Sequence, residues 1–322
     1  MSILQRVPLG RTGLQVSVAG LGAGGHSRLG LARGKSDDEA VAVIHTALER
    51  GVNFVDTAIT YGTEEVVGRA LQGRRDGIVL STKVPLCVQA DGSPSHRGQL
   101  ASRHNVVQWA EASLRRLRTD HIDILFLHAV TPELYLHARE ELCPALRQLK
   151  EKGKIGAIGL SEHFMSDTGH RMLNRAVDDD CWDVVMVGFN VINQSAAFLL
   201  RKMRERGIGT VCAFAVRGAL SNRERARKLV LDLVASGQVD ARDIDETAPL
   251  DFLIEGGCAE NLPDAAYRFC RHAEGVDTVL TGTGDAQHLR ANLTSIAAGP
   301  LHHEAIERAR RIFARVDSVS AE

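Results

Sequence analysis

The sequence of 322 residues has no clear excess of charge, with 39 Lys and Arg against 40 Asp and Glu and a formal net charge of −1. Proteins that bind nucleic acid or membrane surfaces usually rely on a basic excess, so the charge balance argues against both classes. No run approaches the ~18 apolar residues of a membrane span. The first residues, MSILQRVPLGRTG, also lack the apolar core of a signal peptide. We therefore expect a cytoplasmic protein that binds neither nucleic acid nor membranes.

Spacings typical of metal and redox sites are missing as well. The six cysteines are scattered without a CxxC pair, which indicates reduced, mostly buried thiols. The 13 histidines show no HxH or HExxH spacing, and the adjacent His302 and His303 fall in an expected surface helix. We therefore predict no metal site.

The sequence does contain a regular alternation of short apolar runs with amphipathic stretches. The runs predict eight strands, at 16–22, 52–55, 78–80, 122–127, 155–160, 184–189, 208–214 and 278–281. The helical patterns run from a capping box at 36–39 to Gly51, and then over 64–71, 106–117, 136–151, 165–179, 196–206 and 286–296. Each strand is too apolar to be solvated on either face, which indicates a parallel sheet.

Eight strand–helix units in an α/β chain of this length predict a single domain, a (β/α)8 or TIM barrel over residues 1–322. The alternative is a doubly wound open sheet, but the glycine-rich stretch after the first strand has no ordered G-x-G-x-x-G turn. Three additions to the barrel are expected: a hairpin cap over 1–16, a long insert over 215–277 and a C-terminal helix over 302–317.

Polar side chains stand where the predicted strands end. Asp56 follows the second strand, with Tyr61 five residues beyond it, and Lys83 and His128 follow the third and fourth strands. In a barrel of this kind the chemistry lies at the carboxyl ends of the strands. Each residue alone also has a structural explanation: a capping Asp, a half-buried Tyr, a surface Lys, a hydrogen-bonded core His. Their joint occurrence at successive strand ends favours a site.

The ordered set of motifs resembles the aldo-keto reductase superfamily. The motifs are Leu9-Gly10-Arg11-Thr12-Gly13-Leu14, Asp56-Thr57-Ala58-x-x-Tyr61-Gly62, Ser81-Thr82-Lys83, His128 and Gly159-Leu160-Ser161-Glu162-His163. The resemblance implies a barrel that binds NAD(P)H at its carboxyl face and interconverts carbonyls and alcohols, with Asp56, Tyr61, Lys83 and His128 as catalytic residues.

This assignment also makes chemical sense. Carbonyl reduction needs a hydride at carbon and a proton at oxygen, and Tyr61 would supply the proton as general acid. A free phenol has a pKa near 10, and we expect the ammonium of Lys83, held by Asp56, to lower it. His128 would polarise the carbonyl oxygen.

The resemblance implies cofactor contacts that this sequence matches less well. Ser161 is present, but Glu162 stands where an Asn is expected and Met186 where a Gln is expected, and a carboxylate cannot donate to a carboxamide oxygen. Phe214 would stack on the nicotinamide in place of a Tyr. The full expected set is Ser161, Glu162, Phe214, Arg217, Gly282, Thr283, Gly284, His288 and Asn292.

The dinucleotide is left open between NAD and NADP. NADP is usual in the family, but the Lys and Arg expected to bind its 2′-phosphate are Gly282 and His288 here, and Asp285 would repel it. Thr283 and the helix N-terminus after it remain as phosphate or ribose partners, with Asn292 near the adenine and Arg290 as a compensating cation. These substitutions slightly favour NAD.

Two functions remain open: an NAD(P)-dependent carbonyl reductase or alcohol dehydrogenase, and a nucleotide-binding regulatory barrel without significant turnover. The complete set of four catalytic residues favours the enzyme. The loops 23–35 and 85–103 contain no aromatic residue, and they carry the basic residues His26, Arg28, Arg33, His96, Arg97 and Arg103. We therefore expect a small polar or anionic carbonyl substrate, unless these cations are a solvated rim.

Overall fold

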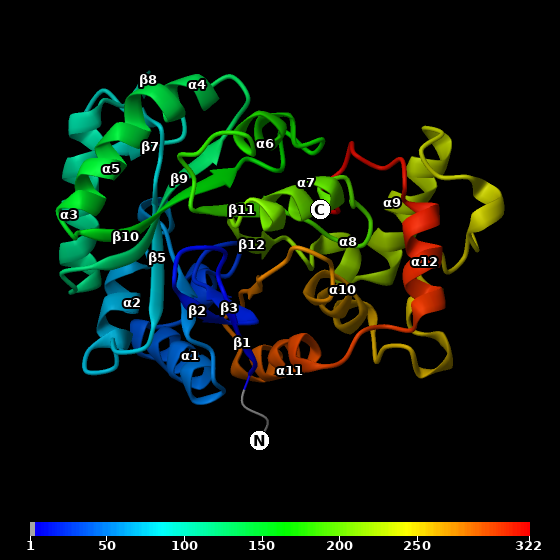
Figure 1. Cartoon of the computed structure of the whole chain (residues 1–322). Coiled ribbons are helices and arrows are strands. Elements are labelled where there is room, and N and C mark those ends of the chain that lie inside the picture. The colour runs from blue at the N-terminus through cyan, green and yellow to red at the C-terminus, as the bar shows by residue number, and fades with distance from the viewer. Residues whose placement is uncertain (1–3) are drawn as a thin grey trace.

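The computed structural model describes residues 4–322, and its centre is a closed barrel of eight parallel strands (Figure 1). The barrel strands are β3 (Ala19–Gly22), β4 (Phe54–Asp56), β5 (Val79–Val84), β9 (Ile122–Val130), β10 (Ile155–Glu162), β11 (Val184–Gly188), β12 (Gly209–Ala213) and β13 (Thr278–Thr281). The sheet closes because β13 pairs with β3 through Leu280 and Gly20. The predicted (β/α)8 barrel is confirmed.

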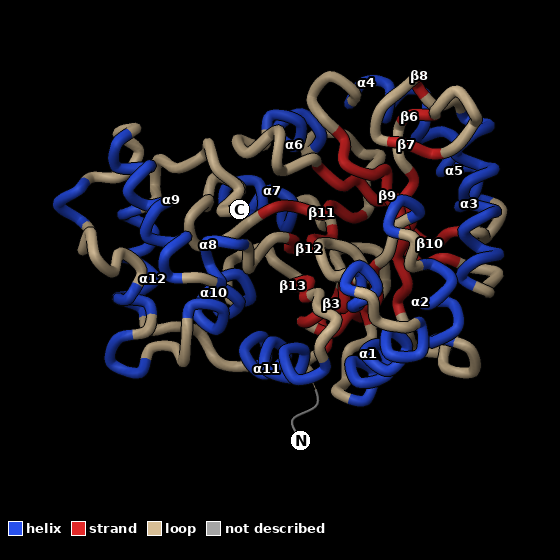
Figure 2. The backbone as a smooth tube through the Cα atoms, turned by 180° about the vertical axis from the view of Figure 1, so that it is seen from behind, coloured by secondary structure: helices blue, strands red, loops and turns tan. Residues whose placement is uncertain are grey.

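Helices surround the barrel, as the view from behind shows (Figure 2). They are α1 (Asp37–Glu49), α2 (Glu64–Leu71), α3 (Arg103–Leu117), α4 (Tyr135–His137), α5 (Cys143–Glu151), α6 (Arg171–Ala176), α7 (Ala197–Glu205), α8 (Gly218–Ser221), α9 (Arg223–Ala235), α10 (Leu262–Arg271), α11 (Ala286–Ala297) and α12 (His303–Ile312). A π-helical turn over Ala138–Leu142 joins α4 to α5. None of the helices among residues 4–322 is long and apolar enough to cross a membrane.

One predicted helix is much shorter than expected. The pattern over 165–179 predicted a full helix, but α6 begins only at Arg171. The carboxylate of Asp167 accepts hydrogen bonds from the backbone N–H groups of Arg171 and Met172, at 3.1 and 2.8 Å. The residue before the helix, His170, is left-handed with φ of 54°. The turn over 163–170 therefore precedes the helix.

The amino end of the barrel is closed by the predicted hairpin. Strands β1 (Arg6–Pro8) and β2 (Gln15–Ser17) pair antiparallel, and Leu9 in their turn is fully buried against Gly209 at the start of β12. Leu9 and Val16 join the apolar cluster that fills the barrel interior, together with Phe54 and Phe126. Access to the barrel is therefore from the opposite, carboxyl end.

Two insertions surround that carboxyl end. After β5, a small sheet is formed by β6 (Cys87–Val88), β7 (Pro94–Ser95) and β8 (Gln99–Leu100). The segment between β12 and β13 is mostly helical, and Figure 1 shows its α9 beside α12 on one side of the molecule. The side chain of Asn193 donates to the carbonyl of Val319 at 2.9 Å, which brings the end of the chain back to the barrel.

Candidate active site

Four polar side chains come together at the carboxyl end of neighbouring strands. Asp56 is the last residue of β4, Lys83 lies in β5 and His128 in β9, while Tyr61 lies on a 3₁₀ turn (Ile59–Tyr61) after β4. The buried ammonium of Lys83 donates to both carboxylate oxygens of Asp56, at 2.6 and 2.5 Å, and to the carbonyl of Thr57 at 2.9 Å. All its donors are thereby used in holding it in place.

The charges of this ion pair follow from burial and mutual attraction. Burial acts to lower the pKa of Lys83, but the attraction of Asp56 and Tyr61 outweighs it and raises that pKa. Burial raises the pKa of Asp56, while Lys83 and a hydrogen bond of 2.7 Å from Ser81 Oγ oppose the rise. Since each ion is the other's direct partner, we take both groups as charged.

Tyr61 lies between Lys83 and His128. The Lys83 nitrogen is 5.0 Å from the centre of the Tyr61 ring, and the Tyr61 hydroxyl is 3.3 Å from Nε2 of His128. The expectation that Lys83 lowers the pKa of Tyr61 is only partly met. Burial raises this pKa and Lys83 opposes the rise, so the net direction is upward. The Tyr61 hydroxyl is therefore neutral in the free protein.

His128 is neutral as well. Burial and the nearby charge of Lys83 place the pKa of His128 well below its ordinary value, with smaller effects of His96 and His163. A neutral imidazole has one N–H, so it donates a hydrogen bond from one nitrogen and accepts at the other.

These side chains face a cleft of about 1080 Å³ at the barrel mouth. Of the four, Asp56, Tyr61 and His128 line it, while Lys83 lies behind them. Its basic lining residues are His26, Arg33, His96, Arg97, His163, Arg217, Arg225 and His288. Apolar lining comes from Phe164, Met165, Met186, Phe214 and Leu280.

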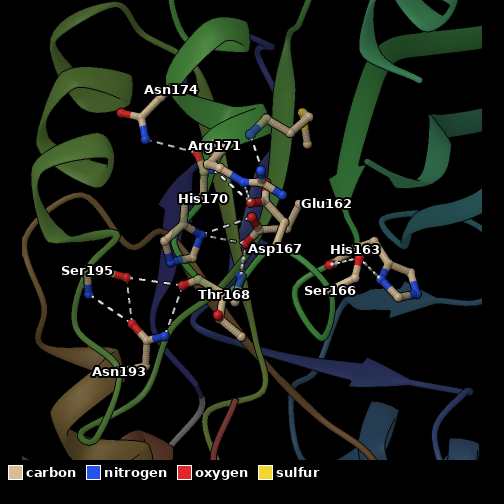
Figure 3. A network of polar contacts seen from close by, with 12 residues as sticks. Glu162, His163, Ser166, Asp167, Thr168, His170, Arg171, Asn174, Asn193 and Ser195 are labelled. Carbon is tan, nitrogen blue, oxygen red and sulfur yellow. Dashed lines mark hydrogen bonds and ion pairs between the residues drawn. The ribbon is translucent and has the colours of Figure 1, made fainter. Parts of the chain in front are cut away.

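Glu162 is already occupied by protein partners. Its carboxylate accepts from the backbone N–H of Gly188 at 2.6 Å and lies 2.9 Å from Nδ1 of His170, as Figure 3 shows for the histidine. Burial raises the pKa of Glu162, and His170 opposes the rise. The sequence pattern did not reveal this pairing, which depends on the left-handed turn at His170. Ser161 and Met186 line the same part of the cleft.

Some of the residues expected around the rest of the cofactor line the same cleft. Phe214, Arg217, Gly282 and Thr283 line the cleft, and the Arg217 guanidinium lies 4.7 Å from the Phe214 ring centre. Within residues 4–322, Nε of Arg217 is buried without a hydrogen-bond partner, and the same side chain pairs with Glu322. The Arg217 guanidinium is therefore held beside Phe214 and paired with a carboxylate of the protein itself.

Polar groups of the protein that were expected near the adenosine half of the cofactor are already hydrogen-bonded to other groups of the protein. Asp285 caps α11, accepting from the backbone N–H groups of Gln287 and His288 at 2.8 Å each. Asn292 donates to Thr281 Oγ1 at 2.9 Å, so its amide is partly used. Neither Asn292 nor Gly284 lines the cleft, although His288 does. A cation that sequence analysis missed, Lys35, donates to the carbonyl of Gly284 at 2.8 Å.

Sequence analysis also missed a neighbour of His128. The hydroxyl of Thr60 lies 3.4 Å from Nδ1 of His128 and 3.3 Å from Nε2 of His96. Thr60 stands at an unspecified position of the Asp56–Gly62 motif, and His96 was noted only as a loop cation. Among residues 4–322, no group of three His, Cys, Asp or Glu side chains is placed to hold a metal ion.

A parallel barrel with Tyr, Lys, Asp and His converging at its carboxyl end is the architecture of a barrel oxidoreductase. The model of the Aldo/keto reductase family matches residues 20–313, and the chain belongs to this family. Members of the family are oxidoreductases of carbonyl compounds that typically use NAD(P)H.

Individual relatives agree with this assignment. Aldo-keto reductase YhdN of Bacillus subtilis is 36% identical over 157 residues, which is 47% of this chain and 44% of that protein, so the match spans less than half of its length. L-galactose dehydrogenase of Arabidopsis thaliana is 31% identical over 222 residues, 66% of each chain. The holo form of aldo-keto reductase AKR11C1 from Bacillus halodurans has the same fold, with a TM-score of 0.73, 23% identity and 98% of both chains covered.

Proposed function

We propose that this protein is an NAD(P)-dependent oxidoreductase that reduces an aldehyde or ketone to the alcohol, or catalyses the reverse, with Tyr61 as general acid/base. The observation that carries the proposal is the convergence of two polar groups: the Tyr61 hydroxyl lies 3.3 Å from His128 Nε2 at the cleft. A carbonyl oxygen placed between them would meet one group that donates a hydrogen bond and one that transfers a proton.

The roles of the four residues follow from their charges. The bound nicotinamide supplies the hydride. Tyr61 transfers its hydroxyl proton to the carbonyl oxygen, and its pKa is raised in the free protein, so it is protonated at neutral pH. The ammonium of Lys83, held by Asp56, stabilises the phenolate that remains after transfer. His128 donates from Nε2 to the same oxygen and fixes its position.

We assign to the cofactor the side chains of Ser161, Phe214 and Arg217 and the backbone of Gly282 and Thr283, all of which line the cleft. Ser161 would meet the carboxamide, Phe214 the nicotinamide face and Arg217 the pyrophosphate. The carboxylate of Glu162 lines the cleft but is held by Gly188 and His170, so its contact with the carboxamide is at most an acceptor contact.

The substrate we propose is small and polar or anionic. His26, Arg33, His96, Arg97 and His163 all line the cleft, and of these Arg33 and Arg97 carry fixed charge. A sugar-like substrate is in keeping with the relative named L-galactose dehydrogenase.

The test is turnover of polar aldehydes, ketones, sugars and bulky hydrophobic ketones, followed by nicotinamide absorbance, for the wild type and Tyr61→Phe. We expect the wild type to prefer polar carbonyls and Tyr61→Phe to lose several orders of magnitude in kcat with cofactor affinity unchanged. Cofactor binding without turnover in the wild type would instead support a regulatory barrel. Near-normal reduction by Tyr61→Phe would refute the mechanism, and equal efficiency on hydrophobic ketones would refute the substrate class.

A further inference from the structure

A chain of polar contacts leads from the surface of the protein to Tyr61. His96 is exposed on the loop between β7 and β8, and its Nε2 lies 3.3 Å from Thr60 Oγ1. That oxygen lies 3.4 Å from Nδ1 of His128, whose Nε2 is 3.3 Å from the Tyr61 hydroxyl. The His96 ring also packs against the His128 ring, with centroids 4.6 Å apart and an interplanar angle of 77°. The contacts are at the long end of hydrogen-bond distances but form one unbroken series.

Which group donates and which accepts at each contact determines whether Tyr61 and His128 can donate to a substrate oxygen. Neutral His128 carries one proton, either on Nε2 or on Nδ1. With the proton on Nε2, His128 donates toward Tyr61 and the substrate oxygen, and the Tyr61 proton stays free for transfer. With the proton on Nδ1, Nε2 is an acceptor that takes the Tyr61 proton as a hydrogen bond, so neither group is ready to donate to a carbonyl.

Thr60 and His96 decide between these two states. The Thr60 hydroxyl has a single proton, and it can give that proton to His128 Nδ1 when its oxygen accepts from His96 Nε2–H. Burial, and then the charge of Lys83 behind the site, lower the pKa of His128 and keep its ring neutral. The tautomer therefore determines whether Nε2 donates or accepts.

We propose that Thr60 and His96 are positioning residues that hold His128 in the tautomer protonated on Nε2, with its ring turned toward Tyr61. This inference rests on the proposed function, in which His128 donates to the substrate oxygen. Neither residue touches the reacting atoms in this scheme. Thr60 acts through Nδ1 of His128, and His96 acts through the hydroxyl of Thr60.

The first experiment is ¹⁵N NMR of the histidine side chains in uniformly ¹⁵N-histidine-labelled full-length protein, with the His128 signals assigned by their loss in His128→Gln. In the wild type we expect Nε2 of His128 protonated and Nδ1 accepting a hydrogen bond. In His96→Phe, which keeps the ring contact and removes the N–H, the Thr60 hydroxyl is free to turn, so a fraction protonated on Nδ1 is expected. In Thr60→Val the Nδ1 signal is expected to move to that of an unbonded acceptor.

The second experiment is steady-state kinetics of Thr60→Val. Loss of a hydrogen bond that orients His128 should lower kcat about tenfold, while KM and the cofactor Kd stay within about twofold. Thr60→Ser, which keeps the hydroxyl, should recover most of the loss. The matched control is Thr46→Val, because within residues 4–322 the hydroxyl of Thr46 bonds only to Ala42 of its own helix.

The inference is overturned if wild-type His128 carries its proton on Nδ1, or if Thr60→Val changes neither kcat nor the Nδ1 signal. A wild type that turns over no carbonyl would refute the proposed function, and the NMR result would still decide the tautomer. A loss in Thr60→Val that Thr60→Ser fails to recover would also count against it, since it would show that a hydroxyl at this position is not sufficient to orient His128.

Discussion

Gly24 lies directly against the ring of Tyr61. A Cβ atom added to Gly24 would be 2.4 Å from Cε2 of Tyr61 and 2.7 Å from its Cδ2 and Cζ, closer than any real contact. Gly24 follows β3, and Tyr61 follows β4, its neighbour in the barrel. The absence of a side chain at residue 24 therefore makes room for the proposed proton donor.

We expect Gly24→Ala to displace the Tyr61 ring and reduce kcat by at least about tenfold, because a small shift of a proton donor is costly. Overpacking should also reduce the free energy of unfolding by about 1–3 kcal/mol. Kinetics and urea unfolding measure the two effects. Gly299→Ala is the control, since its added Cβ meets nothing within 4 Å. Full activity of Gly24→Ala would show that Tyr61 tolerates the shift.

Removing one member of the buried ion pair between Lys83 and Asp56 should destabilise the folded protein. Lys83→Met leaves the buried carboxylate of Asp56 without its cation, which should cost about 3–5 kcal/mol of unfolding free energy. The double variant Lys83→Met/Asp56→Leu should be less destabilised than the single one, because no unpaired charge remains. Both are expected to lack activity.

Urea unfolding gives these free energies. The control is Lys150→Met. This variant breaks an ion pair with Asp183, in which the nitrogen and the oxygen are 2.6 Å apart and the lysine side chain is 42% exposed. Because the pair is at the surface, its loss should reduce the free energy of unfolding by at most about 1 kcal/mol. A loss in Lys83→Met no larger than in Lys150→Met would show that Asp56 is stable without its partner.

Stability should fall on mild acidification partly because of His128. Its pKa in the folded protein lies well below the ordinary 6.5, so the unfolded state binds its proton first as pH falls. The folded state is then destabilised progressively from about pH 6.5 down to the folded pKa. The wild type should therefore lose more unfolding free energy between about pH 7.5 and 5.5 than His128→Gln does. Parallel curves for the two proteins would contradict a neutral, buried His128.

The cofactor preference should respond to one added charge. Asp285 occupies the N-terminus of α11, and Lys35 is the cation found beside it, at the carbonyl of Gly284. We expect wild-type Kd values for NADH and NADPH within about tenfold of each other, with NADH slightly tighter. His288→Arg should tighten NADPH about tenfold and leave NADH unchanged, because it adds a fork-shaped partner for the 2′-phosphate.

Fluorescence titration with both dinucleotides measures these constants. His104→Arg, on the exposed part of α3 away from the cleft, controls for net charge. NADPH more than about tenfold tighter than NADH in the wild type, a difference of ~1.4 kcal/mol, would show that the wild type already has a cation that binds the 2′-phosphate.

The barrel and the polar residues at its mouth could both be predicted from the pattern of residues along the chain. Eight apolar strands that alternate with helices favour a parallel sheet that closes into a barrel. All eight predicted strands are found in that barrel. In such a sheet every strand ends at the same rim. Because Asp56, Lys83 and His128 stand at the ends of successive predicted strands, they could be expected to lie side by side. In the structure the strands that carry them, β4, β5 and β9, are indeed neighbours.

The interactions between these groups could not be predicted in this way, because they depend on the three-dimensional packing. The net rise in the pKa of Tyr61 depends on how deeply the hydroxyl is buried, which motif spacing does not encode. Glu162 meets His170 because a left-handed turn replaces the first part of an expected helix. The contact of Lys35 with Gly284 spans 249 positions of sequence. Such pairings arise from close packing of segments that are distant in the chain, whereas periodicity reports only which face of each segment is buried.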